Sequence, residues 1–357
     1  MFLTFSLRGL AETSVGFNVN MADAMIMSEI KSRCFIRLSV LDAYKVSLFW
    51  EISIVFFTFT FENKLSLMAR VIVTGGGGQL AGEFARLATT GTDELFVATH
   101  AELDITSAES VASYLDSHHA DVVVNCAAYT AVDKAESEPT AAYRVNAEGV
   151  AVLAREVAKR DMVLIHISTD YVFSGTARVP YTEGDTPAPQ CVYGETKWQG
   201  EREMLDSGCR GIIIRTGWLY SSIGHNFVRT IAEKAQRGEP LRVVADQWGT
   251  PTYAADLAAA VMKIIPQILE RRLNGELFHY SNYGETSWWE FADTIASMIE
   301  SASVVEPIAT ADWPTPARRP EYSVLDKTKI KAWFGVDVPD WELSLSRCLH
   351  EMGLIKD

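Results

Sequence analysis

The chain has 357 residues, which is enough for one large domain or two closely joined ones with ample material for a core. Its formal net charge of −14 and its isoelectric point near 5.0 argue against a general affinity for nucleic acid or for an anionic membrane, and no basic stripe appears along the sequence. The five cysteines form no CxxC pair and leave one over, so neither a zinc site nor a disulfide framework is indicated, and a reducing cytoplasm fits best.

Residues 1–67 do not follow the pattern of the rest of the chain. Their one apolar run, Val46 to Phe61, is interrupted by Glu51 and is shorter than the ~20 apolar residues that a transmembrane helix usually needs. It also lies too far from the amino terminus for a secretory signal, and no small-residue cleavage site follows it. We interpret Met68 as the natural start and residues 1–67 as a mis-assigned, non-native extension. A disordered leader and a membrane-associating segment are the alternatives.

From Met68 onward, short β-rich runs alternate with helical stretches, which is typical of a parallel sheet covered by helices on both faces. The predicted strands are Arg70–Thr74, Glu94–Thr99, Val122–Asn125, Met162–Ser168 and Gly211–Arg215. The predicted helices begin near Gln79 and then cover Ser107–His118, Pro139–Lys159 and Gly194–Asp206. This order predicts an α/β fold with a Rossmann-type, doubly wound parallel sheet.

Beyond Thr216 the pattern loosens, which favours a smaller C-terminal substrate-binding lobe. The features there are predicted helices at Asn226–Arg237 and Ala254–Leu269, isolated strands, and a proline-rich stretch from Pro307 to Pro320. The predicted domains are an NAD(P)-binding domain over 68–216 with part of 240–267, and a mainly substrate-binding lobe over 217–357.

A glycine-rich turn follows the first predicted strand directly. It has the form G-x-x-G-x-x-[G/A], with Gly75, Gly78 and Ala81 in its three key places. Small residues let backbone approach a pyrophosphate and let the helix pack on the strand, while the amino end of the helix favours negative charge. The position between a strand and a helix therefore predicts cofactor binding rather than a simple tight turn.

The end of the second predicted strand lacks the usual acidic residue. Thr99 and His100 stand in its neighbourhood, so no carboxylate is obviously placed to reject a 2′-phosphate. NADPH is therefore acceptable, and NADH is not excluded. Asp104 could lie near the adenine, although an acidic loop or a helix cap explains this residue nearly as well.

Tyr193 and Lys197 stand four residues apart in a predicted helix and so share one of its faces. A nearby ammonium stabilises phenolate, so we expect Lys197 to lower the pKa of Tyr193 from its ordinary value of about 10. That would give a proton donor suited to a carbonyl that is being reduced. The alternative is a partly buried helix tyrosine beside a solvated lysine, a pair that helices carry by chance.

Further segments extend this pattern, and with them the chain resembles the dTDP-4-dehydrorhamnose reductase family of the extended short-chain dehydrogenase/reductase superfamily. The segments lie at 78–80, 125–136, 145–147, 168–173, 193–197, 215–220, 246–252 and 317–320. The resemblance covers essentially Met68 to the end. Among its small departures, Ala81 stands where glycine is more frequent and Gly217 stands where serine often does.

The resemblance implies NAD(P)H-dependent reduction of the C4 ketone of dTDP-4-dehydro-β-L-rhamnose to dTDP-β-L-rhamnose, for surface polysaccharide. The catalytic residues that it implies are Thr169, Tyr193 and Lys197. The cofactor-binding residues are Gly75, Gly78, Gln79, Leu80, Asp104, Ala127, Ala128, Tyr193 and Lys197. The substrate-binding residues are Thr169, Asp170, Tyr171, Trp218 and Asn226, although a large aromatic such as Trp218 is ordinarily core. Arg318 and Arg319 could grip nucleotide phosphates or be ordinary surface arginines.

Two other functions are left open by the sequence. The resemblance extends to the regulatory subunit of methionine adenosyltransferase, a nucleotide-binding module that acts through a partner enzyme, and other nucleotide-linked keto-sugars are alternative substrates. The sequence predicts no metal-ligating set. Family members often form homodimers, sometimes with a divalent cation such as Mg²⁺, and Glu83 matches an acidic position implicated in that contact. An acidic residue near a helix amino end needs no metal, however.

Overall fold

The computed structural model describes residues 69–88 and 94–356, all of which belong to one compact unit, Met68–Asp357. The predictions for residues 1–67 lie outside the described residues. Within the described residues, no helix is both long and apolar enough to cross a membrane.

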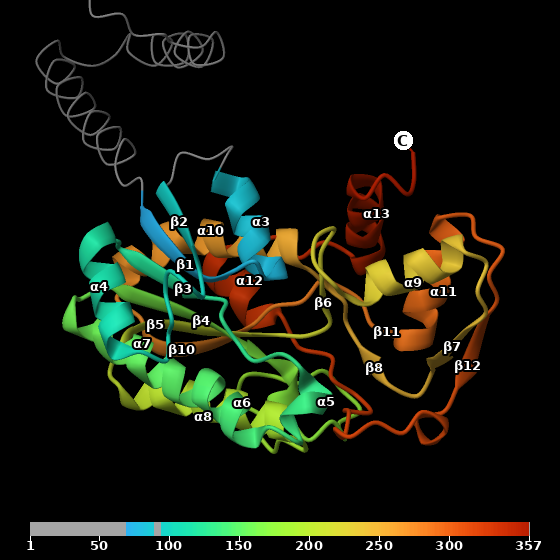
Figure 1. The fold of residues 1–357 in the computed structure, drawn as a ribbon, viewed down its shortest axis with the longest axis horizontal. Helices are drawn as coiled ribbons and strands as arrows, with labels where there is room; N and C mark the ends of the chain where they lie inside the picture. The colour runs from blue at the N-terminus through green and yellow to red at the C-terminus, as the bar shows by residue number, and fades with distance from the viewer. Residues whose placement is uncertain (1–68, 89–93, 357) are drawn as a thin grey trace, which may run out of the picture. The chain divides into compact units, whose positions relative to one another are not determined.

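Six parallel strands form the main sheet, in the order β10-β5-β4-β3-β1-β2 (Figure 1). They are β1 (Arg70–Gly76), β2 (Glu94–Thr99), β3 (Val122–Asn125), β4 (Val163–Thr169), β5 (Arg210–Thr216) and β10 (Asn274–His279). The chain goes outward from β1 to β2 and then returns to β3, so the carboxyl ends of β1 and β3 mark the point where the winding reverses. Ligands of doubly wound sheets bind at such a point. The predicted fold class and the first five predicted strands are confirmed.

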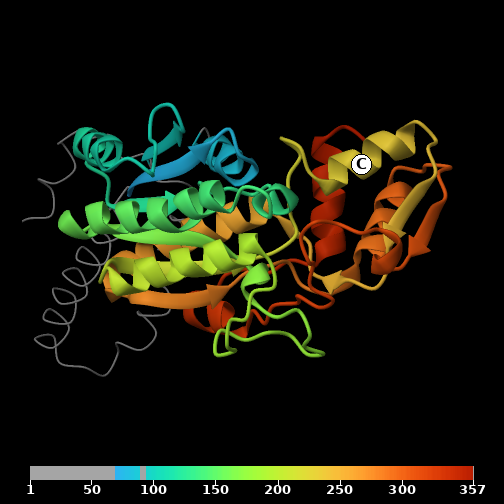
Figure 2. The ribbon, with the colours of Figure 1, turned by 60° about the horizontal axis from the view of Figure 1, so that its bottom comes forward.

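Helices cover both faces of this sheet (Figures 1 and 2). One face carries α3 (Gln79–Ala88), α10 (Ala254–Arg271) and α12 (Thr328–Phe334). The other face carries α4 (Ala108–His118), α7 (Gly149–Lys159) and α8 (Val192–Asp206). The strands are therefore buried on both sides, which explains why their sequences are continuous apolar runs.

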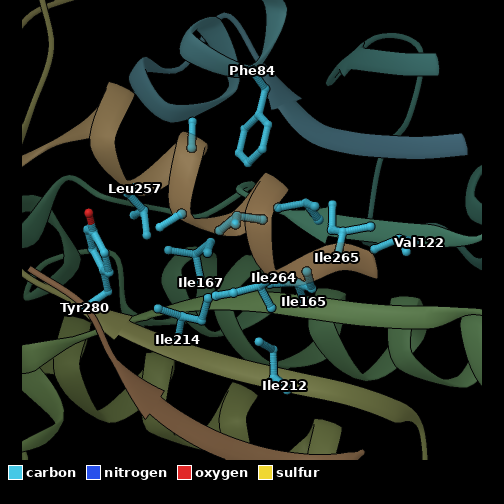
Figure 3. Packing of buried hydrophobic residues seen from close by; sticks show 14 of the residues in the cluster. Phe84, Val122, Ile165, Ile167, Ile212, Ile214, Leu257, Ile264, Ile265 and Tyr280 are labelled. Atoms are coloured by element: carbon cyan, nitrogen blue, oxygen red, sulfur yellow. The ribbon is translucent and has the colours of Figure 1, made fainter. Parts of the chain in front are cut away.

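Branched side chains fill the interface between the sheet and α10 (Figure 3). Ile165 and Ile167 of β4 and Ile214 of β5 pack with Leu257 and Ile264 of α10, and all five are at most 9% exposed. Each such side chain contributes about 1.5–3 kcal/mol when fully buried. This packing fixes the end of β4, which the site described below depends on.

The predicted helix Pro139–Lys159 is interrupted in the structure. It consists of α6 (Pro139–Tyr143), a π-helical turn η1 (Arg144–Glu148) and α7. Within η1, the Asn146 side chain is fully buried; it donates to the Tyr129 carbonyl oxygen at 3.1 Å and to Thr196 Oγ1 at 3.1 Å. A π-helical turn redirects a side chain in this way, frequently at functional sites.

Residues beyond β5 form a separate hydrophobic core that contains Tyr220, Tyr253 and Phe291. Its helices are α9 (Phe227–Gln236), α11 (Trp288–Met298) and α13 (Trp341–Glu351). Its short strands are β6 (Leu219–Tyr220), β7 (Leu241–Val244), β8 (Trp248–Gly249), β9 (Thr252–Tyr253), β11 (Thr286–Ser287) and β12 (Val305–Ile308). The remaining short elements are α5 (Val132–Ala135), η2 (Asp170–Val172) and η3 (Thr310–Asp312).

The loosened part of the sequence also returns to the main sheet. β10 pairs with β5, and the chain after Pro320 joins the two parts: Tyr322 N donates to the Gly175 carbonyl oxygen at 3.0 Å, while Trp248 N donates to the Glu321 carbonyl oxygen at 2.8 Å. The sequence analysis did not identify β10, α11, α12 or α13, although the capping box of Ser287 and Glu290 is a local signal for the start of α11. The division into a cofactor-binding domain and a substrate-binding lobe stays a prediction.

Candidate active site

A cavity of about 840 Å³ lies at the carboxyl ends of β1, β3 and β4. It is lined on one side by the glycine turn after β1 and the residues after β3, and on the other side by Trp218 and Trp288. All predicted cofactor-binding residues line it, namely Gly75, Gly78, Gln79, Leu80, Asp104, Ala127, Ala128, Tyr193 and Lys197. The predicted substrate-binding residues Thr169, Asp170, Tyr171 and Trp218 line it too.

The glycine turn has the close backbone approach that a pyrophosphate cradle requires. Gly75 has φ +78°, and a Cβ atom added to it would lie 2.9 Å from the Ala127 amide nitrogen. Gly78 N donates to the Gly75 carbonyl oxygen at 3.0 Å, and α3 begins at the next residue. The Gln79 side-chain oxygen is buried without a hydrogen-bond partner at this edge of the cavity. A bare backbone, a helix amino end and an unused polar atom all fit a dinucleotide.

Replacing Gly75 with alanine is expected to weaken cofactor binding by roughly tenfold or more, because both the left-handed backbone and the close Ala127 contact oppose a Cβ. Titration of tryptophan emission with NADPH measures the dissociation constant. The matched control is Gly208→Ala, since Gly208 has φ +67° outside the cavity and its added Cβ would meet nothing within 4 Å. Equal affinities of the Gly75 variant and the unaltered protein would contradict the cradle.

Asp104 lies at the far end of the cavity, near His100. Its carboxylate accepts hydrogen bonds from Thr106 N at 2.9 Å and Thr106 Oγ1 at 2.8 Å. Burial acts to raise the pKa of Asp104, but these hydrogen bonds and the charges of His100 and Arg144 outweigh it and lower the pKa. The local turn therefore uses one carboxylate oxygen, and contact with an adenine stays a prediction.

The three predicted catalytic side chains converge because the carboxyl end of β4 lies beside the amino end of α8. Thr169 is the last residue of β4, and α8 presents Tyr193 and Lys197 one turn apart. Thr169 Oγ1 donates to Asp170 Oδ1 at 3.0 Å and is a hydrogen-bond neighbour of the Tyr193 hydroxyl. Lys197 Nζ donates to the Ile167 carbonyl oxygen at 2.7 Å.

The expectation that Lys197 lowers the pKa of Tyr193 is wrong. Burial raises the pKa of Tyr193 above its ordinary value, and the hydrogen bond with Thr169 opposes that shift only in part. Burial is the largest influence on the phenol, while the Lys197 ammonium donates to the Ile167 carbonyl oxygen of β4. Tyr193 is therefore a neutral phenol at neutral pH, which is the form that donates a proton.

Lys197 itself is 2% exposed, and burial lowers its pKa to about 8, while Glu201 and Cys126 act in the opposite direction. Asp170, which also lines the cavity, is 2% exposed, and burial raises its pKa to about 6, while hydrogen bonds with Ser323 and Thr169 act in the opposite direction. The cavity floor thus holds several ionisable groups whose pKa values are displaced by burial. Such groups cluster at functional sites.

Trp218 takes a strained conformation at the opposite wall. Its φ is +48°, which is uncommon for a bulky residue, and its ring stacks on that of Trp288 with centroids 3.6 Å apart and planes 9° apart. A Cβ added to Gly249 would lie 2.4 Å from the Trp218 ring, so glycine is required behind it. Strain held by its surroundings is typical of ligand clamps. The sequence analysis missed Trp288, because 70 residues separate it from Trp218 and no local motif marks it.

Asn226 is not among the residues that line the cavity, and its contact with the substrate stays a prediction. It is the N-cap of α9: its Oδ1 accepts from Arg229 N at 3.1 Å, and its Nδ2 donates to the Ser221 carbonyl oxygen at 2.8 Å. The amide is therefore used to end a loop and begin a helix. Sequence alone does not separate an N-cap asparagine from a ligand-binding one.

Arg318 and Arg319 also lie outside the set of residues that line the cavity. Arg319 Nη2 donates to Asp133 Oδ2 at 2.7 Å, and Arg318 Nη1 lies 3.4 Å from Gln190 Oε1. In this structure they attach the segment near Pro320 to α5 and to the loop before α8. Arg319 also acts on Tyr171, which lines the cavity, and a phosphate-gripping role for the two arginines stays a prediction.

The carboxylate of Glu83 is bound by neighbouring side chains of the protein. It is 3% exposed, accepts a hydrogen bond from Ser221 and forms an ion pair with Arg86 at 3.3 Å. Among the residues that the structure describes, no group of three or more His, Cys, Asp or Glu side chains is placed to hold a metal ion. The Mg²⁺ considered from the sequence therefore has no support.

Comparison with known proteins shows which family has this sequence. Residues 69–354 match the family model described as RmlD substrate binding domain. The dTDP-4-dehydrorhamnose reductase of Aggregatibacter actinomycetemcomitans is 41% identical over 290 residues, which are 78% of this chain and 97% of that protein. The probable dTDP-4,6-dihydroxy-2-methyloxan-3-one 4-ketoreductase of Streptomyces antibioticus is 37% identical over 285 residues, 79% of this chain and 95% of that protein.

A solved structure agrees with these relatives. The dTDP-4-dehydrorhamnose reductase of Bacillus anthracis, crystallised in complex with NADP, superimposes with a TM-score of 0.75 at 35% identity. The match covers 79% of this chain and 99% of that one.

Proposed function

Because the chain belongs to the RmlD substrate binding domain family, we propose that it reduces the C4 ketone of dTDP-4-dehydro-β-L-rhamnose to the alcohol of dTDP-β-L-rhamnose. The proposal rests on one observation, which is that Thr169, Tyr193 and Lys197 line the same cavity as the glycine turn. The B. anthracis relative, crystallised with NADP, supports NADPH as the cofactor, with NADH as an alternative. Biosynthesis of dTDP-rhamnose for surface polysaccharide in the cytoplasm is the corresponding role.

The residues of the cavity have separate tasks in this reaction. The glycine turn and the amino end of α3 hold the pyrophosphate, and Lys197 holds the nicotinamide ribose. The bound cofactor supplies hydride to the carbonyl carbon. As charge develops on the carbonyl oxygen, Tyr193 donates its phenolic proton and Thr169 gives a second hydrogen bond, so the stabilisation is greatest in the transition state. Contact with the sugar is assigned to Asp170 and Tyr171, which line the same cavity.

Trp218 and Trp288 form a stacked aromatic pair in the cavity lining, to which we assign the sugar side of the site. Replacing Trp288 with leucine removes the stack that holds Trp218 in its strained conformation. We expect the KM for the sugar nucleotide to rise roughly tenfold, or about 1.4 kcal/mol, and the KM for NADPH to stay within twofold. Steady-state kinetics with each substrate varied in turn measure both constants.

Trp313→Leu is the control for that prediction, because Trp313 is 57% exposed and does not line the cavity. A Trp288 variant with an unchanged KM for the sugar would show that the aromatic pair is only core packing.

The proposed function is tested with the full chain, NADPH and dTDP-4-dehydro-β-L-rhamnose, by following the near-ultraviolet absorbance of NADPH. Oxidation that requires the sugar supports the reductase. Absence of oxidation with both NADPH and NADH, in protein that still binds either cofactor, rejects this substrate.

A second substrate is favoured by one comparison. The S. antibioticus 4-ketoreductase is nearly as similar to the chain as the rhamnose enzymes are, so other dTDP-linked 4-keto-sugars belong in the same assay. Inactivity on all of them, together with co-purification of a methionine adenosyltransferase, would favour the regulatory module instead. Dimerisation stays a prediction, and gel filtration with light scattering tests it.

A further inference from the structure

Glu201 lies on the same helix as Tyr193 and Lys197, one turn after Lys197. The three residues stand four apart in α8, so they follow one face of the helix. Glu201 is 2% exposed, and its carboxylate accepts from Ser168 Oγ at 2.5 Å and from Arg215 Nε and Nη2 at 2.8 and 2.6 Å. Arg215 is also 2% exposed. No role in the reaction described above uses this buried ion pair.

Glu201, Ser168 and Arg215 belong to three different elements, α8, β4 and β5, which meet at the cavity. Ser168 is the residue before Thr169 at the end of β4, and Arg215 lies near the end of β5, just before Gly217 and Trp218 of the cavity wall. Glu201 therefore ties α8 to both strands at the level of the reacting groups. Burying such a pair adds little net stability compared with apolar residues of similar volume, so its position calls for another explanation.

We propose that Glu201 is a positioning residue that holds Lys197 in its charged state and fixes α8 against the end of β4. This inference rests on the proposed function, in which Lys197 binds the cofactor as an ammonium. Arg215 completes the arrangement because its Nε and Nη2 atoms both donate to the Glu201 carboxylate and hold it in place.

The groups around Lys197 come from four elements, and Glu201 is the carboxylate that acts on it most strongly. Cys126 follows β3, His166 lies on β4, Tyr193 precedes Lys197 on α8, and Arg215 stands behind Glu201 on β5. Burial raises the pKa of the Cys126 thiol and of Tyr193, and it lowers the pKa of His166 well below its usual range, so these three are neutral near pH 7. Glu201 is the largest influence that raises the pKa of Lys197 against its burial.

The test is the pH dependence of NADPH binding, followed by quenching of tryptophan emission from pH 6 to 10 in the full chain. We expect affinity to fall at alkaline pH as Lys197 loses its proton. In Glu201→Gln with Arg215→Met, which replaces the pair by neutral side chains, the alkaline midpoint should move roughly one pH unit lower. Glu201→Gln alone, in which the amide oxygen still accepts hydrogen bonds, is the second variant and should shift in the same direction.

Two controls separate positioning from general structure. Asp256→Asn with Arg347→Met neutralises another ion pair, whose Nη2 to Oδ1 distance is 2.5 Å and whose residues do not line the cavity, and should leave the midpoint in place. Lys197→Met should abolish the alkaline fall. An unchanged midpoint in both Glu201 variants, an equal shift in the Asp256 control, or an alkaline fall that survives Lys197→Met would overturn the proposal. Because the assay contains no sugar, failure of the reductase reaction and failure of this inference are distinguishable.

Discussion

Replacing Tyr193 with phenylalanine is expected to lower kcat/KM for the sugar nucleotide by about 10²–10⁴-fold, the usual contribution of a positioned acid. The phenol borders Thr169 at the cavity floor, and burial keeps it protonated at neutral pH. Phenylalanine removes only the hydroxyl, so the shape of the helix face is kept. The dissociation constant of NADPH should stay within a few-fold of the original value. Stopped-flow or steady-state assays and an NADPH titration measure the two effects.

Tyr143→Phe is the matched control for this experiment. Tyr143 lies on α6, is 40% exposed and does not line the main cavity, so losing its hydroxyl should leave kcat/KM unchanged. If Tyr193→Phe retained full activity, the proton would have to come from another group, and Asp170 would be the first to examine.

Replacing Lys197 with methionine is expected to reduce kcat/KM roughly 10²-fold or more, because the ammonium that holds the cofactor is lost. The free energy of unfolding of this variant should stay the same or increase, in contrast to its activity. Burial depresses the pKa of Lys197 to about 8 in the folded protein, against about 10.4 for an unperturbed lysine. The folded state therefore binds fewer protons than the unfolded state between these values, and stability rises as pH rises through that window.

The same linkage means that, below about pH 8, the buried charge opposes folding by roughly 3 kcal/mol. Methionine removes this penalty together with the hydrogen bond to the Ile167 carbonyl oxygen. We expect urea unfolding at pH 7 to show unchanged or increased stability, and the Lys197-dependent rise in stability above pH 8 to disappear. An active variant, or a strongly destabilised one, would contradict the functional assignment of this lysine.

The parts of the site that the sequence predicted are those encoded locally. Gly75 and Gly78 lie within one turn, and Tyr193 and Lys197 lie within one helical turn, so their spacing alone indicates their shared faces. The strands from β1 to β5 were predictable for the same reason, because each is a continuous apolar run between turn residues.

The parts that escaped prediction depend on contacts between distant residues. Trp288 reaches Trp218 only through the packing of α11, and Glu201 meets Arg215 only because α8 lies on β5. The effect of Lys197 on Tyr193 was predicted with the wrong sign because burial, which decides it, is a property of the folded chain. The N-cap role of Asn226 was not predicted, because capping a helix and binding a ligand use the same amide.

The most direct measurement of the central claim follows the hydride itself. The full chain is given NADPH that carries deuterium at the transferable C4 position, together with dTDP-4-dehydro-β-L-rhamnose, and the product is examined by mass spectrometry and proton NMR. The account predicts dTDP-rhamnose with one deuterium at C4 of the sugar and none when Tyr193 is replaced by phenylalanine on the same time scale. Product without deuterium at C4, or oxidation of NADPH with no change in the sugar, would contradict it.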